Sequence, residues 1–378
     1  MPRLRIALVT ETYPPEINGV AMSVKRFADG LRERGHALQL VRPRQPQERA
    51  SADNGEILTR AARIPRYPHL QMGLCSSQRL LQCWRAERPD VVHIATEGPL
   101  GFTALRAARK LGVPVSSSFH TNFHAYSRHY GIGWLQASVL RYLRHFHNRA
   151  GATMVPTDAM QDRLSASGFE RLHTVARGVD TQLFSPTRRD AGLRAEWGVD
   201  DATPAILYVG RLAGEKRTDL AIRAFAALQA RLPRARMIWV GDGPLRARLE
   251  ASLPAHTFCG VKTGVELARH YASADLFIFP SMTETWGNVM PEAMASGLAV
   301  LAFDYAAAHE NIRSGENGLL VPFGDEQAFV DAALPLVDVG FARELGARAA
   351  RTARGIAWEI CVEHFERVLL NISGAATV

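Results

Sequence analysis

Short apolar runs that alternate with helix-like segments are the feature that most constrains the fold of this 378-residue chain. The segment Ala21–Arg34, for example, has helical spacing that puts Val24, Phe27 and Leu31 on one face. Strands that alternate with helices form right-handed βαβ units and parallel sheets. The runs expected as strands are Arg5–Thr10, Ala37–Val41, Val91–Ala95, Val113–Phe119, Thr153–Pro156, Ala205–Gly210, Met237–Gly241, Leu276–Pro280 and Ala299–Phe303.

The alternation runs twice, with a break near Arg177–Asp190 that contains Gly178 and Pro186. A chain of this length typically forms about two domains. We therefore expect two doubly wound, Rossmann-like α/β domains, residues 1–176 and 177–355, that face each other across a cleft. Ligands of such folds bind beyond the carboxyl ends of the strands, so a ligand is expected in that cleft.

Composition excludes several classes of protein. No apolar run reaches the roughly 18 residues that span a bilayer, and the apolar start is too short for a signal peptide, with Glu11 close behind it. The four cysteines form no Cys-x-x-Cys pair, which suits a reducing cytoplasm and argues against a zinc or disulfide framework. A cytoplasmic protein without a structural zinc site is therefore expected.

Charge is distributed unevenly along the chain. Residues 1–180 carry 25 basic and 14 acidic residues, a net charge of +11, whereas residues 181–378 carry 20 and 23, a net charge of −3. A basic half suggests an anionic partner, either a membrane surface or a nucleic acid, although an arginine-rich composition without such a partner explains it equally well.

Two carboxylates, Glu284 and Glu292, frame the most informative segment. A strand ends at Pro280, a polar loop follows, and a helix is expected to begin near Gly287. Each carboxylate can accept hydrogen bonds from vicinal hydroxyls of a sugar or ribose. The first N–H groups of a helix have no partner within it, so those of Asn288, Val289 and Met290 could bind a diphosphate. The alternative is one exposed and one helix-capping glutamate.

Three further segments place polar groups at the ends of expected strands. Arg211 and Lys216 follow one strand and could clamp a diphosphate, or could form a solvated turn with Glu215. Asn18 and Gly19 lie between the first strand and helix, in a loop that can approach a ligand or serve as an ordinary turn. His120 follows another strand. A lone histidine is more often a structural or surface residue, but a place at the carboxyl end of a strand favours a functional one.

The segment Glu284-Thr-Trp-Gly-Asn-Val-Met-Pro-Glu292 resembles the Glu-x7-Glu motif of retaining, GT-B-fold glycosyltransferases of family 4. The resemblance covers nearly the whole chain and is closest to a bacterial subgroup of GDP-mannose-dependent alpha-mannosyltransferases and diacylglycerol glycosyltransferases. Its other motifs are Thr10–Val20, Ser118–Asn122, Arg177–Asp180, Gly210–Arg217 and Gly241–Pro244. The chain departs from the family pattern at Arg177, where the family often has asparagine.

The resemblance implies a role for each candidate residue. Glu292 would bind the ribose and Glu284 would face the donor sugar, while Arg211 and Lys216 would clamp the leaving diphosphate. The loop of Asn18 and Gly19 would cover the diphosphate, His120 would orient the sugar, and the base would lie near Val261. Retention without an evident nucleophile implies same-face attack. The last helices, from about residue 356 to 378, would cross back to complete the first domain.

The expected function is transfer of a hexose from GDP-mannose, UDP-glucose or UDP-glucuronate to a lipid or lipid-linked acceptor such as diacylglycerol. A soluble small molecule or a polysaccharide intermediate is the alternative acceptor. No Asp-x-Asp triplet occurs, so metal independence and no cofactor are expected. Arg246 replaces the third glycine of a dinucleotide-binding turn, which argues against an oxidoreductase. A non-catalytic nucleotide-sugar or nucleic-acid binder is the other class, and no nucleic-acid-binding motif supports it.

The stretch Trp134–Arg149 has helical periodicity, with aromatic residues between basic ones. Such a helix suits an anionic membrane surface, and the basic first half of the chain adds to that interpretation. A core-packed helix with a solvated face is the alternative. The expected location is therefore cytoplasmic, with peripheral attachment to the inner face of the cytoplasmic membrane as an option.

Overall fold

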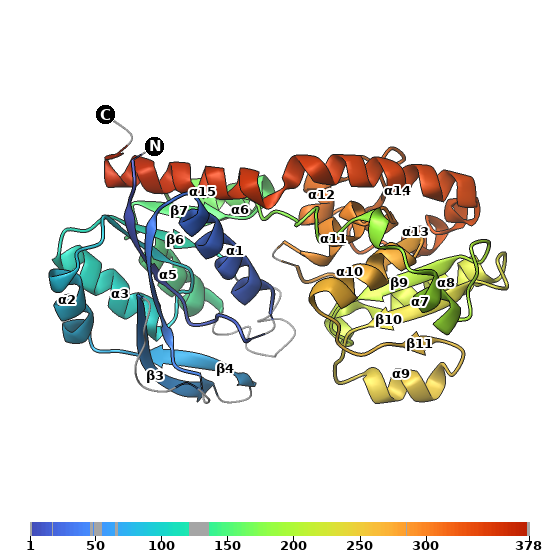
Figure 1. Cartoon of the computed structure of the whole chain (residues 1–378), viewed down its shortest axis with the longest axis horizontal. Helices are drawn as coiled ribbons and strands as arrows, with labels where there is room; N and C mark the ends of the chain where they lie inside the picture. Colours follow the sequence, from blue (N-terminus) through green and yellow to red (C-terminus); the bar gives the residue numbers. More distant parts are fainter. Residues whose placement is uncertain are drawn as a thin grey trace. The chain divides into compact units, whose positions relative to one another are not determined.

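A computed structural model describes residues 2–16, 18–45, 48, 55–64, 67–120, 136–284 and 286–375. The chain forms two compact units, Met1–Arg177 with Trp358–Val378, and Gly178–Ala357 (Figure 1). The chain therefore passes from one unit to the other twice.

The described part of the first unit contains an eight-stranded sheet in the order β4-β3-β2-β1-β5-β6-β7-β8, in which only β3 and β4 pair antiparallel. Its strands are β1 (Arg5–Val9), β2 (Ala37–Pro43), β3 (Glu56–Ile64), β4 (Tyr67–Leu74), β5 (Val91–Ile94), β6 (Val115–Ser118), β7 (Ala152–Val155) and β8 (Leu172–Thr174). Its helices are α1 (Gly19–Glu33), α2 (Ser77–Ala86), α3 (Pro99–Lys110), α5 (Gln136–His147), α6 (Asp158–Ala166) and α15 (Trp358–Ser373).

Helices cover both faces of this sheet because its central strands are apolar on both sides. Along β1, Ala7 and Val9 pack with residues of α2 and α3, whereas Ile6 packs with residues of α1 and α15. Strands that are buried on both faces read as continuous apolar runs, which is why these runs were visible in the sequence.

Helix α15 lies along the first unit (Figure 1), and its buried residues belong to the core of that unit. Phe365 stacks on Phe27 of α1 with ring centroids 4.5 Å apart. Next to it, the buried Glu366 carboxylate accepts hydrogen bonds from Arg34 Nε and from His36 Nε2, both at 2.7 Å. A buried carboxylate without such partners would be strongly destabilising.

The second unit contains, in its described residues, a six-stranded parallel sheet in the order β11-β10-β9-β12-β13-β14. Its strands are β9 (Ala205–Val209), β10 (Arg236–Val240), β11 (Thr257–Phe258), β12 (Leu276–Phe279), β13 (Ala299–Phe303) and β14 (Leu319–Val321). Its helices are α7 (Ala191–Glu196), α8 (Thr218–Gln229), α9 (Arg246–Ser252), α10 (Gly264–Ser273), α11 (Val289–Ala295), α12 (Ala307–Asn311), α13 (Glu326–Asp331) and α14 (Val339–Ala353), with short 3₁₀ turns between them.

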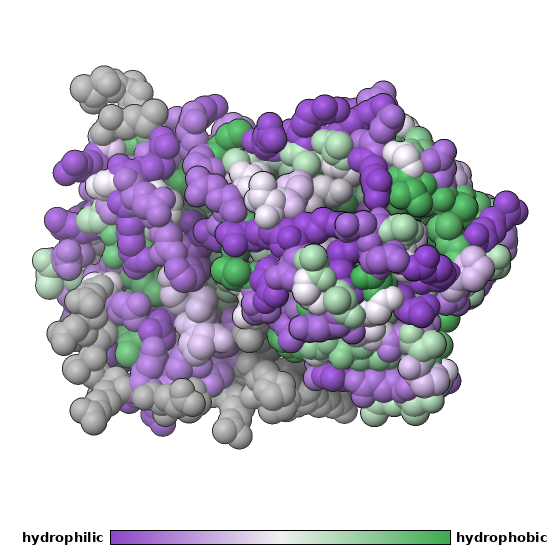
Figure 2. All heavy atoms as spheres, turned by 45° about the vertical axis from the view of Figure 1, so that its right-hand side comes forward, coloured by the Kyte–Doolittle hydropathy of each residue, from purple (hydrophilic) through white to green (hydrophobic). Residues whose placement is uncertain are grey.

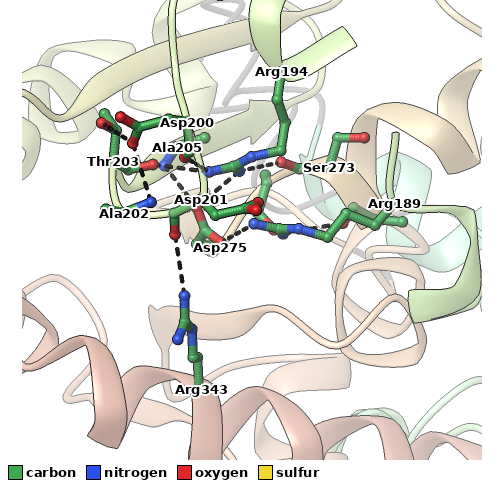
Figure 3. A network of polar contacts seen from close by, with 12 residues as sticks. Arg189, Arg194, Asp200, Asp201, Ala202, Thr203, Ala205, Ser273, Asp275 and Arg343 are labelled. Atoms are coloured by element: carbon green, nitrogen blue, oxygen red, sulfur yellow. Dashed lines mark hydrogen bonds and ion pairs between the residues drawn. The ribbon is translucent and has the colours of Figure 1, made fainter. Parts of the chain in front are cut away.

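A polar network ties the amino ends of β9 and β12 together (Figure 3). Asp275, directly before β12, accepts hydrogen bonds from Arg189 at 2.9 Å, from Arg194 at 3.1 Å and from the N–H of Ala205 at 2.8 Å. The buried Arg194 also donates to the carbonyl of Thr203. These contacts fix the register of the two central strands at the edge of the sheet opposite to their carboxyl ends.

Helix α14 packs on the turn that follows α11. A Cβ atom on Gly346 would lie 2.1 Å from the carbonyl oxygen of Gly297, which is backbone and has no rotamer to change. We expect Gly346→Ala to lower the free energy of unfolding in urea by about 1–3 kcal/mol, the usual cost of overpacking. Gly355→Ala is the matched control, because its Cβ would meet nothing within 4 Å. Equal stabilities of the two variants would contradict this packing.

Within the part of the chain that the structure describes, no helix combines the length and the apolar character needed to cross a bilayer. The face drawn in Figure 2 is mainly hydrophilic, with apolar residues in small separate groups.

Candidate active site

The strand order of the second unit creates a switch point between β9 and β12. From β9 the chain continues through β10 to β11 on one side, whereas β12 continues through β13 to β14 on the other. Ligands of open α/β sheets bind at such a point, beyond the carboxyl ends of the strands. The loop after β9 carries Arg211 and Lys216, and the loop after β12 carries Glu284 and leads to Glu292. The sheet thus brings two of the sequence-predicted motifs to adjacent strand ends.

Lys216 and Glu284 meet directly, although 68 residues separate them in the sequence. Lys216 Nζ forms an ion pair with Glu284 Oε1, and the side chains are only 17% and 16% exposed. Ser281 Oγ donates to the same carboxylate oxygen at 2.7 Å, and Tyr305 Oη donates to the backbone carbonyl of Glu284 at 2.6 Å. The carboxylate is therefore held in one orientation.

Arg211 stands two residues beyond β9 and contacts Glu215, which lies one turn further on. Its side chain is 45% exposed. An ion pair this exposed contributes little to stability, so the guanidinium can be drawn to a stronger anion at low cost. The 3₁₀ turn Gly214–Lys216 follows, and α8 begins immediately after it.

Glu292 lies in the short helix α11, near a buried tyrosine that sequence reasoning missed. Tyr271 of α10 donates its hydroxyl to the carbonyl of Val289 at 3.2 Å. Burial first, and then the Glu292 carboxylate, raise the pKa of Tyr271 well above its usual value. Nothing in the local sequence of α10 marks this residue, because only the packing of α10 on α11 brings it to Glu292.

The start of α11 differs in one detail from the expectation. Asn288 is the capping residue and Val289 the first helical residue, but the N–H of Met290 donates to the carbonyl of Gly287 at 3.1 Å. The expectation of an unpaired N–H at Met290 is therefore wrong, because a tight turn precedes the helix. Gly287 has φ +89°, and a Cβ there would lie 3.2 Å from Glu284 Cγ, so glycine permits the close approach of the two.

The loops after β10 and β11 adjoin the loop after β9. A Cβ on Gly241 would lie 2.0 Å from the carbonyl oxygen of Gly210, and the N–H of Gly241 donates to the carbonyl of Gly260 at 2.9 Å. Next to Gly260, Val261 is 55% exposed. An apolar side chain is thus presented at the same edge of the sheet as the charged groups.

The remaining candidates, Asn18, Gly19 and His120, belong to the first unit. Asn18 caps α1, whose first residue is Gly19, by accepting a hydrogen bond from the N–H of Ala21 at 2.8 Å. His120 lies just beyond β6, and its Nδ1 is 2.8 Å from Nη2 of Arg177. Burial first, and then the positive charge of Arg177, hold the pKa of His120 well below its usual value.

Glu11 is a second residue to which sequence reasoning assigned no role. It follows β1, at the switch point between β1 and β5 of the first sheet, and its Oε1 accepts a hydrogen bond from the N–H of Leu100 at 2.8 Å. Burial raises its pKa to about 7, and Glu97 adds to the effect. A Cβ on Gly98 would lie 2.0 Å from Glu11 Oε2, so only glycine fits beneath this carboxyl.

The predicted amphipathic segment Trp134–Arg149 is seen from residue 136 onward as α5. Leu143 and Phe146 are buried, while Arg141 and Arg144 are exposed. The helix therefore packs on the core by its apolar side and presents a basic face. Asn122 and Trp134, which were part of the predicted motifs, lie outside the described residues.

Comparison with known proteins identifies the family. The model of Glycosyltransferase Family 4 matches residues 17–183, and that of Glycosyl transferases group 1 matches residues 203–338. A GDP-mannose-dependent alpha-mannosyltransferase of Mycobacterium tuberculosis is 37% identical, over 97% of this chain and 97% of that protein.

The chain belongs to glycosyltransferase family 4.

Two further relatives of this family 4 glycosyltransferase are named for other sugars. The sulfoquinovosyl transferase SQD2 of Arabidopsis thaliana is 32% identical over 92% of this chain and 69% of that protein. An alpha-monoglucosyldiacylglycerol synthase of Streptococcus pneumoniae is 27% identical over 79% of this chain and 71% of that protein.

Solved structures agree on the fold. Sucrose-phosphate synthase from Thermosynechococcus elongatus superposes with a TM-score of 0.79 at 20% identity, covering 99% of this chain and all of the other. HepE of Anabaena, in complex with UDP and glucose, superposes with a TM-score of 0.75 at 18% identity, covering 98% of this chain and all of the other. The predicted fold class of two parallel-sheet α/β domains is confirmed.

Tyr271 offers a test of the surroundings of Glu292 in this glycosyltransferase. We expect Tyr271→Phe to raise the KM for the glycosyl donor about 5-fold, which corresponds to the roughly 1 kcal/mol of one hydrogen bond. The reason is that Glu292 loses the tyrosine hydroxyl beside it. Steady-state kinetics at saturating acceptor would measure it, with a urea titration alongside. A fall in stability with an unchanged donor KM would mean that the phenol serves only the packing of α10.

Proposed function

We propose that this glycosyltransferase moves a hexose, with mannose from GDP-mannose as the first candidate, to a lipid or lipid-linked acceptor with retention of anomeric configuration. The observation that carries the proposal is the pairing of Lys216 with Glu284 where β9 and β12 end, with Arg211 on the same loop as Lys216. A cation and a carboxylate held together at a switch point suit a substrate that is a diphosphate at one end and a polyol at the other.

In this proposal the donor diphosphate takes Lys216 away from Glu284 and Arg211 away from Glu215. Two fixed cations then stabilise the charge that develops as the diphosphate leaves. Glu284, released from its ion pair, accepts hydrogen bonds from hydroxyls of the sugar, and Glu292 accepts those of the ribose. Val261 and the backbone of Gly260 provide the surface for the base.

The proposed reaction proceeds on one face of the sugar. The bond from the anomeric carbon to the phosphate oxygen breaks, the acceptor oxygen bonds to the same carbon, and the acceptor proton passes to the leaving phosphate. Asn18 and Gly19 would cover the diphosphate and His120 would orient the sugar. Metal independence stays a prediction, and it rests on the two cations and on the lack of an Asp-x-Asp triplet.

The choice of substrates draws on the relatives. The mycobacterial relative is named for GDP-mannose, which supports that donor, while the streptococcal relative is named as a monoglucosyldiacylglycerol synthase, which supports a lipid acceptor. The exposed arginines of α5 favour a peripheral position on an anionic membrane, where each basic residue contributes about 1 kcal/mol. UDP-glucose and UDP-glucuronate are the alternative donors, and a soluble or polysaccharide acceptor is the alternative substrate.

One experiment tests donor and acceptor together. The purified chain is incubated with GDP-mannose, UDP-glucose or UDP-glucuronate and with vesicles of neutral or anionic lipid that contain diacylglycerol, and products are measured by mass spectrometry. We expect hexosyl-lipid from GDP-mannose, faster on anionic vesicles and insensitive to EDTA. If no sugar nucleotide is consumed and none shifts the melting temperature, the proposal is wrong. Transfer only to soluble acceptors would support the glycosyltransferase activity but contradict the proposed lipid acceptor.

A further inference from the structure

We propose that Arg177 is a positioning residue that holds His120 in the neutral tautomer with its proton on Nε2. In that state His120 donates a hydrogen bond from Nε2 and cannot accept a proton from the substrate hydroxyl. The consequence for catalysis rests on the function proposed above, but the state of the ring does not.

The geometry of one contact carries the inference. Arg177 Nη2 lies 2.8 Å from His120 Nδ1, and Arg177 itself is only 5% exposed. A guanidinium has five N–H donors, accepts no hydrogen bond and stays charged at every accessible pH. His120 Nδ1 must therefore offer its lone pair, which leaves Nε2 as the position for the ring proton.

Double protonation of the ring is disfavoured by its surroundings. Burial lowers the pKa of His120, and the groups that face it in the described residues add to the effect, namely Arg177 and the buried His93 and His147. A second proton would have to lie on Nδ1, against the guanidinium. His120 therefore stays neutral through the physiological range.

The other two histidines have their own partners. Ser116 and Ser118 of β6 contact His93 Nδ1 at 2.9 Å and Nε2 at 3.1 Å. Ser117, between them, contacts His147 Nδ1 at 2.9 Å. Burial lowers the pKa of each of these histidines to about 3, so both are neutral at neutral pH. Among the described residues, the neighbours that act on His120 are thus two neutral imidazoles and the charged guanidinium of Arg177.

Arg177 stands where the family often has asparagine, and this difference bears on the tautomer of His120. An asparagine at position 177 could either donate or accept, because its amide has both kinds of group, and would leave the tautomer of His120 open. Arginine can only donate. In this chain the ring therefore presents Nε2–H and no lone pair, which matches a reaction in which the leaving phosphate, and not a histidine, takes the acceptor proton.

The tautomer can be read directly in the whole chain labelled with ¹⁵N-histidine. Long-range ¹H–¹⁵N correlation spectra distinguish a protonated ring nitrogen from an unprotonated one, and His120→Gln assigns the signals. We expect a protonated Nε2 and an unprotonated Nδ1, unchanged from pH 6 to pH 8. A proton on Nδ1, or titration of His120 within that range, would overturn the proposal without any need for a variant of Arg177.

Variants of Arg177 separate positioning from packing. We expect Arg177→Asn to give mixed tautomers or a titrating ring. Arg177→Lys, whose side chain still only donates, should keep the Nε2–H signal of the wild-type chain. In transfer assays Arg177→Asn should lower kcat about 10-fold and make it depend on pH between 6 and 8, with little change in donor KM. A pH-independent loss in both variants would reduce Arg177 to a structural role. Absence of transfer by the wild-type chain would refute the proposed function and leave the tautomer result standing.

Discussion

Replacing Lys216 by alanine is expected to lower kcat by about 100- to 1000-fold, the range found when one preorganised group that stabilises developing charge is removed. In the variant the leaving diphosphate loses a fixed cation, so the charge that develops on it is stabilised less well. Glu284 keeps its hydrogen bond from Ser281. Single-turnover measurement of sugar transfer at saturating donor isolates this step from binding.

The matched control is Arg234→Ala. This arginine belongs to the same unit, pairs with Asp200 and is highly exposed, but it lies before β10, at the amino edge of the sheet. Its removal should leave kcat within 2-fold, as expected for a surface ion pair. If Lys216→Ala and Arg234→Ala are equally active, the loop after β9 does not bind the diphosphate, and the assignment of the site fails.

Replacing Glu292 by alanine is expected to lower kcat/KM for the donor by about 10- to 150-fold, which corresponds to the roughly 1.5–3 kcal/mol of a hydrogen bond to a charged group. Because the ribose is bound equally in the ground state and the transition state, the loss should fall mainly on KM. The free nucleoside diphosphate should lose affinity by a similar factor in calorimetry.

Glu316→Ala, an exposed glutamate in a turn of the same unit, is the comparison for Glu292→Ala. It should leave donor KM unchanged. A large loss of kcat at constant KM in Glu292→Ala would instead assign this carboxylate to the reacting sugar, so the two glutamates would have to exchange roles.

The fold class was predictable because the central strands are buried on both faces and therefore read as apolar runs. The antiparallel pair of β3 and β4 was missed for the complementary reason. β4 is the edge strand and β3 lies next to it, and Arg60 and Arg63 interrupt the apolar residues of β3, which hides it among polar segments. Strands of two or three residues, such as β11 and β14, are too short to show any period.

The site was predictable only in part. The polar residues at strand ends were visible one by one, but the contact of Lys216 with Glu284 depends on β9 lying beside β12, which no local pattern specifies. Tyr271 was missed because a tyrosine in a helix has the appearance of a core residue. Glu11 was missed because a carboxylate in a loop is ordinarily solvated, and only the absence of a side chain at Gly98 allows it to be buried.

The contribution of α15 to the first unit has a consequence for biosynthesis. A ribosome completes residues 178–357 before it reaches the helix that supplies Phe365 and Glu366 to the first core. Until then Phe27 lacks its stacking partner, and His36 and Arg34 lack their carboxylate. The first unit is therefore completed after the second, and a chain that stops before residue 358 would lack part of the first core but contain the whole of the second unit.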